Sequence, residues 1–292
     1  MPRARVYVPT VSNPSSRHAV AGAVDVDGPL AWRETGDGEP AVFLHGLGGS
    51  RTSWEPQLTG LRTEFRCIAW DMPGYGASVP VAPLTFATIA DSVARLLDRA
   101  GVDRAHLVGE SFGGMHALHT ALRHPQRVAR LVLANTSPAF GLDGTDPAAW
   151  RAARLAALDA GLTPADIAAD VLISIAGPAL SDDALAMRVA GFARVPASGL
   201  RAAVECLPAH DVRERLGAIA APALVVAGGL DTETPVAYSR VLADGLQNAE
   251  LIVLDGVGHL AVSEVPQTFN RLVRDFLGRG RGLAPSAPRR AI

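Results

Sequence analysis

The chain has 292 residues, of which 48% are hydrophobic and 19% are charged, and a chain of this length buries a core without disulfides or a structural metal. Its formal net charge of −2 lacks the basic excess of a nucleic-acid-binding protein. All 27 basic residues are arginine, so the sequence excludes a lysine Schiff base and any phosphate-binding loop that requires Gly-Lys.

Residues 1–20 predict a loose N-terminal arm, because prolines and serines occur there without hydrophobic periodicity. The basic start of the arm lacks the apolar stretch of a signal peptide, and no apolar run approaches the length of a membrane span. The only cysteines, Cys67 and Cys206, cannot form a disulfide framework or a CxxC metal site. We therefore expect a cytoplasmic protein without nucleic-acid or membrane partners.

The segments after the arm predict a sheet. Residues 23–26 and 30–33 flank an Asp-Gly-Pro turn and are expected to pair as a hairpin. Short apolar runs then recur along the chain at residues 41–44, 67–70, 106–108, 131–133, 223–226 and 251–254. Such runs are typical of parallel strands, which are buried on both faces.

Helical patterns alternate with these runs at residues 86–100, 112–124 and 260–278, where apolar residues recur at spacings of three and four. Strands that alternate with helices indicate an α/β fold, with a mostly parallel central sheet and helices on both faces. We assign residues 21–140 and 217–278 to this core.

Residues 141–216 interrupt the alternation with an alanine-rich helical pattern, and we expect an inserted helical cap there. Thr163 and Ser181 occupy positions typical of helix N-caps. Residues 279–292, rich in glycine, proline and arginine, predict a disordered tail.

The strongest chemical signal is the sequence Gly-x-Ser-x-Gly at residues 109–113. It directly follows the strand expected at 106–108 and directly precedes a predicted helix. A strand that turns sharply into a helix presents the hydroxyl of Ser111 above the sheet, at the helix N-terminus. We predict that Ser111 is a nucleophile.

A serine hydroxyl needs a base to remove its proton, and the base needs an orienting carboxylate. Asp231 and His259 follow the last two predicted strands, so both lie with Ser111 at the carboxyl ends of the sheet, where open α/β sheets bind ligands. We expect His259 to act as the base and Asp231 to orient it.

Two carboxylates rival Asp231. Glu233 lies in the same turn, whereas Asp255 is expected to shape the turn after the last strand. Asn135 also follows a strand, but an amide cannot stabilise an imidazolium by charge. We favour Asp231 as the acid.

An acyl-transfer site also needs donors for the developing oxyanion, and we expect the backbone N–H groups of Phe112 and Leu47. His45 is expected to support the loop of Leu47, and it is also a candidate substrate contact. His116 and His119 lie three residues apart on the predicted helix, but without an acidic partner they indicate a packed or solvated face rather than a metal site. No metal or organic cofactor is expected.

With these motifs, residues 20–278 resemble the α/β-hydrolase family; residues 45–47 and 71–78, the serine turn, Asp231 and Gly258-His259 carry the resemblance. Residues 47–57 and 134–154 are similar to the 3-oxoadipate enol-lactonase group. The proline of the oxyanion loop often seen in ring-cleavage carbon–carbon hydrolases is replaced by Gly49.

The resemblance implies an α/β-hydrolase fold and a serine hydrolase of small esters or lactones, with an enol-lactone of a dicarboxylate favoured. Trp150 and Arg154 are candidate contacts for a substrate carboxylate, with Arg151 as an alternative to Arg154. A carbon–carbon bond hydrolase of ring-cleavage products and a non-catalytic ligand receptor on the same fold are the alternative functions. The partner is expected to be a small molecule, and a homo-oligomer is possible.

Overall fold

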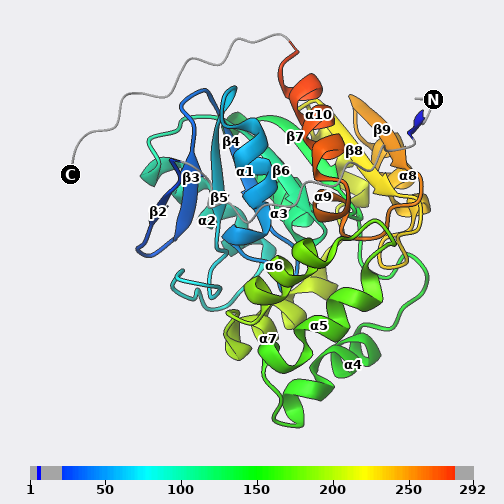
Figure 1. The fold of residues 1–292 in the computed structure, drawn as a ribbon. Coiled ribbons are helices and arrows are strands. Elements are labelled where there is room, and N and C mark those ends of the chain that lie inside the picture. The colour runs from blue at the N-terminus through cyan, green and yellow to red at the C-terminus, as the bar shows by residue number, and fades with distance from the viewer. Residues whose placement is uncertain (1–4, 8–21, 280–292) are drawn as a thin grey trace.

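A mostly parallel sheet forms the centre of the molecule (Figure 1). The computed structural model describes residues 5–7 and 22–279. Within these residues the sheet has nine strands in the order β1-β9-β8-β7-β6-β4-β5-β3-β2. They are β1 (Arg5–Tyr7), β2 (Val24–Val26), β3 (Trp32–Thr35), β4 (Glu39–Leu44), β5 (Phe65–Trp70), β6 (Ala105–Glu110), β7 (Val128–Ala134), β8 (Ala223–Gly228) and β9 (Ala249–Leu254). Only β3 pairs antiparallel, with β2 and β5, and all other neighbours are parallel.

Helices cover both faces of the sheet, because alternate strand residues point to opposite sides. On β4, Val42 and Leu44 belong to one apolar cluster, and Ala41 and Phe43 belong to the other. The first cluster packs against α2 (Phe86–Arg99), α3 (Phe112–Arg123) and α8 (Val236–Gly245), and the second against α1 (Glu55–Leu61), α9 (Ala261–Glu264) and α10 (Pro266–Leu277). Short 3-10 helices add η1 (Arg51–Trp54), η2 (Pro125–Arg127), η3 (Leu207–Ala209) and η4 (Arg213–Ala218). The predicted α/β architecture is confirmed.

Four helices stand between β7 and β8 in the chain and gather below the sheet in Figure 1. They are α4 (Pro147–Asp159), α5 (Pro164–Ile175), α6 (Asp182–Phe192) and α7 (Ala197–Cys206), which we call the cap helices. Both N-caps have the expected geometry: the Thr163 N–H donates to Asp166 over 2.8 Å, and Ser181 Oγ accepts from the Ala184 N–H over 3.3 Å. These contacts satisfy N–H groups that the first turn leaves without helical partners.

The chain enters and leaves the cap helices at one place, which we call the neck. A single antiparallel bridge joins Ala139 to Asp211. Beside it, the Phe140 N–H donates to His210 O over 2.8 Å, and the Val212 N–H donates to Pro138 O over 2.9 Å. The neck therefore fixes where the cap helices stand relative to the sheet.

Two segments differ from the sequence expectation. Arg5–Tyr7, placed in the loose arm, forms β1 and pairs with the edge of β9. The helix expected over 260–278 is divided into α9 and α10, because Pro266 has no N–H for a helical hydrogen bond and starts a new helix instead.

The rest of the predicted arm, residues 1–4 and 8–20, lies outside the described residues, as does the tail from residue 280 on. Across the described part of the chain, no helix is both long enough and apolar enough to traverse a membrane.

Candidate active site

Ser111 sits at the sharp turn between β6 and α3. Its φ of 53° and ψ of −120° lie outside the regions that side-chain-bearing residues prefer, which costs about 1–3 kcal/mol. The turn closes because Gly109 and Gly113 meet: a Cβ on Gly109 would collide with the carbonyl oxygen of Gly113. Thr136 Oγ1 also donates to Ser111 O over 2.7 Å. The close approach of the two glycines and the bond from Thr136 therefore hold Ser111 in its strained conformation.

Three side chains from the ends of different strands form one hydrogen-bonded chain. His259 Nε2 lies 3.0 Å from Ser111 Oγ. His259 Nδ1 lies 2.9 Å from both carboxylate oxygens of Asp231. The structure thus brings together the three residues that the sequence analysis selected, although 148 positions separate Ser111 from His259.

Asp231 is fixed by donors on every side. Its Oδ1 accepts the N–H groups of Glu233 and Thr234, each over 2.9 Å. Its Oδ2 accepts Thr234 Oγ1 over 2.7 Å and Asn135 Nδ2 over 2.8 Å. Burial opposes ionisation of this carboxyl, but the charge of His259 and these hydrogen bonds hold its pKa well below its ordinary value of 3.8.

The two rival carboxylates are bound to another residue or face solvent instead of binding the His259 ring. Glu233 Oε2 accepts from Arg154 Nη2 over 2.6 Å, and Asp255 is exposed. Burial lowers the pKa of His259, but the charge and hydrogen bond of Asp231 outweigh burial, and the pKa is raised above 6.5. The carboxylate that orients the ring and stabilises its protonated form is that of Asp231.

Glu264, which the sequence analysis did not single out, holds the loop of His259. Its Oε2 accepts the Gly258 N–H over 2.8 Å, and its Oε1 accepts the Leu260 N–H over 3.0 Å. One buried carboxylate therefore binds the backbone on both sides of the histidine. The signal was an acid five residues after His259, at the end of a short helix.

Asn135 and a cap helix complete this support. Asn135 Nδ2 also donates to Gly258 O over 3.0 Å, so one amide links the loops of Asp231 and His259. The His259 N–H donates to Ile175 O, at the end of α5, over 3.0 Å. Asn135 is thus a partner of the acid rather than its replacement.

The loop of the two expected oxyanion donors lies against the serine. A Cβ on Gly46 would stand 3.2 Å from Ser111 Cβ, so glycine permits this approach. Leu47 lines the same cavity as Ser111. Phe112 is the first residue of α3, where the backbone N–H has no helical partner. Both N–H groups therefore lie on segments that border the Ser111 hydroxyl.

His45, a candidate substrate contact from the sequence, is fully buried and is not among the described residues that line the cavity of Ser111. Its Nδ1 is 2.9 Å from Gly46 O, and the Met72 N–H donates to its Nε2 over 3.1 Å. Burial lowers the pKa of His45, so the ring is neutral and can accept that bond. Both ring nitrogens of His45 are therefore bound to backbone, one at Gly46 and the other at Met72, and the ring holds the loop of Leu47 in place.

Ser111 and His259 line a small cavity of about 100 Å³ between the sheet and the cap helices. Apolar side chains from the cap helices form a large part of its wall; examples are Val171, Phe192 and Leu200. A cavity far below the several hundred Å³ of a typical ligand site admits a small substrate.

Two arginine–glutamate pairs also line this cavity. Arg154, expected to bind a substrate carboxylate, instead donates to Glu233 and lies over the ring of Trp150, with 5.4 Å between its Cζ and the ring centroid. Arg188 of α6 donates to Glu110, the residue before Ser111. Trp150 and Arg154, the candidate contacts for a substrate carboxylate, border the cavity, and so do Arg188 and Glu110, which the sequence analysis did not single out.

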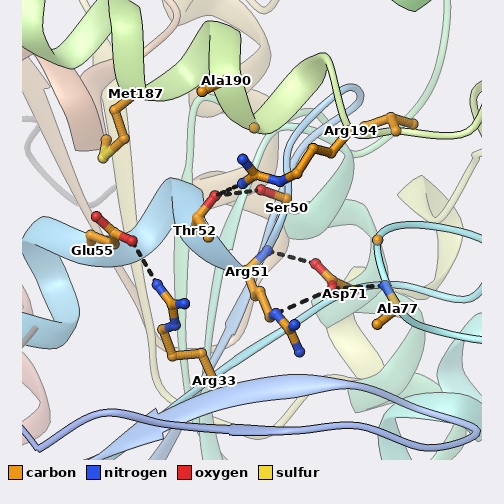
Figure 2. A pocket seen from close by; sticks show the side chains of 13 residues that line it. Arg33, Ser50, Arg51, Thr52, Glu55, Asp71, Ala77, Met187, Ala190 and Arg194 are labelled. Atoms are coloured by element: carbon orange, nitrogen blue, oxygen red, sulfur yellow. Dashed lines mark hydrogen bonds and ion pairs between the residues drawn. The ribbon is translucent and has the colours of Figure 1, made fainter. Parts of the chain in front are cut away.

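A second, wider cavity of about 790 Å³ lies on the other side of α6 (Figure 2). Figure 2 shows Arg33 bound to Glu55 and Arg51 bound to Asp71, over 2.6 and 3.5 Å. A third arginine, Arg194, donates to a threonine of η1 over 2.8 Å. The described residues that line it include no member of the Ser111 hydrogen-bonded chain.

The two histidines of α3 pack against other rings. Within the described part of the chain, neither buried ring nitrogen of His116 has a hydrogen-bond partner, and the ring packs on Phe112, with 4.1 Å between centroids. His119 Nε2 lies 3.1 Å from His210 Nδ1. No cluster of three potential metal ligands occurs among residues 5–7 and 22–279.

The chain is similar to known proteins over most of its length. Residues 40–158 match the alpha/beta hydrolase fold model, and residues 201–286 match the model of TAP-like proteins. A Variovorax paradoxus protein named "putative carbamate hydrolase RutD" is 39% identical, across 86% of this chain and 96% of its own length.

Two further similarities bear on the chemistry. The 3-oxoadipate enol-lactonase 1 of Acinetobacter baylyi is 27% identical, across 90% of this chain and 95% of its own length. The crystal structure of a hydrolase from Pseudomonas aeruginosa superposes with a TM-score of 0.78 at 32% identity, across 89% of this chain and all of the other.

Proposed function

The chain belongs to the α/β-hydrolase family, and on this premise we propose that it is a serine hydrolase that cleaves a small ester or lactone through an acyl-enzyme on Ser111. The observation that carries the proposal is the hydrogen-bonded chain from Ser111 Oγ through His259 to Asp231, with distances of 3.0 and 2.9 Å. Ser111 and His259 also line the same cavity. A serine with this base and this acid is activated for attack on a carbonyl carbon.

In the first half of the reaction, His259 Nε2 accepts the hydroxyl proton as Ser111 Oγ attacks the carbonyl carbon. The negative charge that develops on the carbonyl oxygen is stabilised by the N–H groups of Leu47 and Phe112. The His259 imidazolium, paired with Asp231, then gives its proton to the leaving oxygen. The carbon–oxygen bond breaks, and the acyl group stays on Ser111.

In the second half, water takes the place of the leaving alcohol. His259 removes a proton from this water as it attacks the acyl carbon, and the same two N–H groups stabilise the oxyanion. Collapse of the intermediate returns the proton to Ser111 Oγ and releases the acid. Asp231 keeps the same tautomer and orientation of His259 throughout.

A neutral small ester or lactone suits the cavity better than the enol-lactone of a dicarboxylate that the sequence resemblance favoured. The small cavity limits the size of the acyl part, and both of its arginines, Arg154 and Arg188, are already bound to glutamates. A carbamate ester is the second candidate, favoured by the RutD similarity, and it uses the same steps.

Turnover of a substrate panel tests the proposal. Wild-type enzyme and Ser111→Ala are assayed on small esters, lactones and carbamate esters, and on a vinylogous diketone. We expect multiple turnovers on at least one ester-type substrate and a kcat lower by about 10⁶ in Ser111→Ala. Cleavage of the diketone alone would indicate a carbon–carbon hydrolase, and stoichiometric binding without turnover would indicate a receptor.

A further inference from the structure

A buried ion pair joins a cap helix to the residue that precedes the nucleophile. Arg188 Nη1 of α6 donates to Glu110 Oε2, at the end of β6, over 2.9 Å. The side chains are only 5% and 1% exposed, and both line the cavity that holds Ser111 and His259. The pair therefore borders the cavity in which the proposed function places the scissile bond.

Stability alone does not explain this pair. Removing two charges from water costs several kcal/mol per ion, and apolar residues of similar size are often as stabilising. The pair also leaves hydrogen-bonding capacity unused: no described residue donates to the buried Oε1 of Glu110. An ionised carboxylate can only accept hydrogen bonds, so a bound molecule that brings a donor would satisfy it.

Three kinds of substrate group can be compared by how well they satisfy the hydrogen-bonding groups of Glu110 and Arg188. An alkyl group leaves Oε1 of Glu110 without a donor and the guanidinium of Arg188 without a further acceptor. A carboxylate can accept from Arg188, but it brings a second negative charge beside Glu110 in an apolar enclosure, which is unfavourable. A carboxamide-type group offers an N–H donor and an oxygen acceptor on one neutral planar unit, and it matches both partners.

We propose that Glu110 and Arg188 are specificity-determining residues that select substrates whose acyl part carries a carboxamide-type group. The N–H of that group donates to Glu110 Oε1, and its oxygen accepts from Arg188, while the scissile carbonyl faces Ser111. This inference rests on the proposed function and names the substrate class for the same cavity.

The other pair in the cavity lacks these properties. Arg154 and Glu233 are 32% and 33% exposed, so water screens their charges and can satisfy their remaining donors and acceptors. Selection by unsatisfied groups is strong only where water is excluded. The buried pair of Glu110 and Arg188 therefore dominates the choice of the polar group.

Three methyl esters of nearly equal shape test the proposal. Methyl malonamate carries –CONH₂, methyl acetoacetate carries –COCH₃, and methyl hydrogen malonate carries –COO⁻ at the same position. We expect the wild-type kcat/KM for the amide to exceed that for the ketone and for the carboxylate by about tenfold or more. A wild-type enzyme that favours the ketone or the carboxylate overturns the proposal.

The double variant Glu110→Leu/Arg188→Met removes both charges together, because a single removal would leave an uncompensated buried charge and endanger folding. Its amide-to-ketone ratio of kcat/KM should fall by about tenfold or more, towards one. The variant Arg201→Gln/Asp159→Asn is the matched control: this exposed pair joins α7 to α4 without lining the cavity, so its ratio should equal that of the wild type.

The outcomes separate the two proposals. If the double variant slows all three esters equally, the pair is only structural and the specificity proposal is wrong, whereas the serine mechanism stands. If Ser111→Ala hydrolyses the esters as fast as the wild type, the proposed function itself is wrong. The ratio of two isosteric substrates is independent of the amount of folded enzyme, so partial unfolding of the variant does not obscure the result.

Discussion

The sheet and the cap helices share one cavity but contribute to it in different ways. From the strand ends come Ser111, Asp231 and His259, each held by hydrogen bonds to backbone groups of other residues. From the cap helices come mainly apolar side chains and two arginines. Under the proposed function, the strand ends position the reacting groups, and the cap helices form the wall that selects the substrate.

Polar contacts join the two regions at several places. They include the neck, the Arg154–Glu233 and Arg188–Glu110 pairs, the bond from Arg194 to Thr52, and the bond from the His259 N–H to Ile175 O. The last of these ties the cap helices to His259, the proposed base. Substitutions on each side of this boundary should thus have separable effects, and the following predictions test that separation.

Asp231→Asn should have the largest effect, a fall in kcat of about 10⁴, because an amide stabilises neither the required tautomer nor the imidazolium. The wild-type acid limb of kcat/KM should lie above pH 6.5, since the base must be unprotonated and its pKa is raised. In Asp231→Asn the acid limb moves to lower pH, because burial lowers the pKa of His259 and the charge of Asp231 no longer opposes it.

Glu233→Gln is the control, and its kcat should stay within about threefold of the wild-type value. A loss of kcat as large as that of Asp231→Asn would mean that Glu233 is the acid.

Glu264→Gln should lower kcat by about ten- to a hundredfold and leave KM nearly unchanged. The amide keeps one acceptor, so one of the N–H groups of Gly258 and Leu260 is left unpaired, at about 1–3 kcal/mol. The histidine between them then loses its fixed orientation. Steady-state kinetics with urea unfolding at the same pH separates this loss from instability, and a variant with unchanged kcat would contradict the positioning role.

Acid should weaken the neck. His210 Nε2 lies 2.8 Å from Ser137 O, and burial lowers the pKa of His210 to about 4 and that of His119 to about 3. The unfolded chain binds protons near pH 6.5, whereas the folded chain does not until about pH 4, so stability is lost as pH falls through this window.

We expect about 3 kcal/mol lower free energy of unfolding at pH 4 than at pH 7 from His210. Urea midpoints at several pH values measure it. His210→Gln, which keeps one donor and one acceptor, should reduce the dependence on pH; the same slope in this variant would exclude His210 as the cause.

The smallest effect is expected from the apolar wall. Val171→Ala in α5 enlarges the cavity and should raise the kcat/KM of methyl hexanoate relative to methyl acetate by about fivefold. Ile173→Ala, two residues away and exposed, is the control and should leave the ratio unchanged. Equal effects of the two substitutions would mean that α5 does not set acyl-chain length.

Local patterns predicted most of the sheet and all members of the hydrogen-bonded chain. The apolar runs marked the strands because parallel strands are buried on both faces. Ser111, Asp231 and His259 were found because each follows a strand, and the fold brings strand ends together. β1 was missed because a strand of three residues is too short to show a hydrophobic periodicity. Its pairing also depends on β9, near the other end of the chain.

The supporting residues could not be found in this way. Glu110 and Arg188 are 78 positions apart, and nothing in either neighbourhood indicates that a buried charge is paired. Asn135 reaches the loops of Asp231 and His259 only because its φ of 47° turns the backbone there. Such contacts depend on how the helices and loops pack together, and the hydrophobic periodicity of a single segment does not predict this packing.

Covalent labelling of the active-site serine tests the central claim most directly. The wild-type enzyme is treated with a fluorophosphonate, digested, and mapped by mass spectrometry. We predict one adduct, on the peptide that contains Ser111, and no adduct on Ser111→Ala, while inactivation of ester hydrolysis follows the extent of labelling. A modified Ser111→Ala protein, or full activity after stoichiometric labelling of Ser111, would contradict the assignment of the nucleophile.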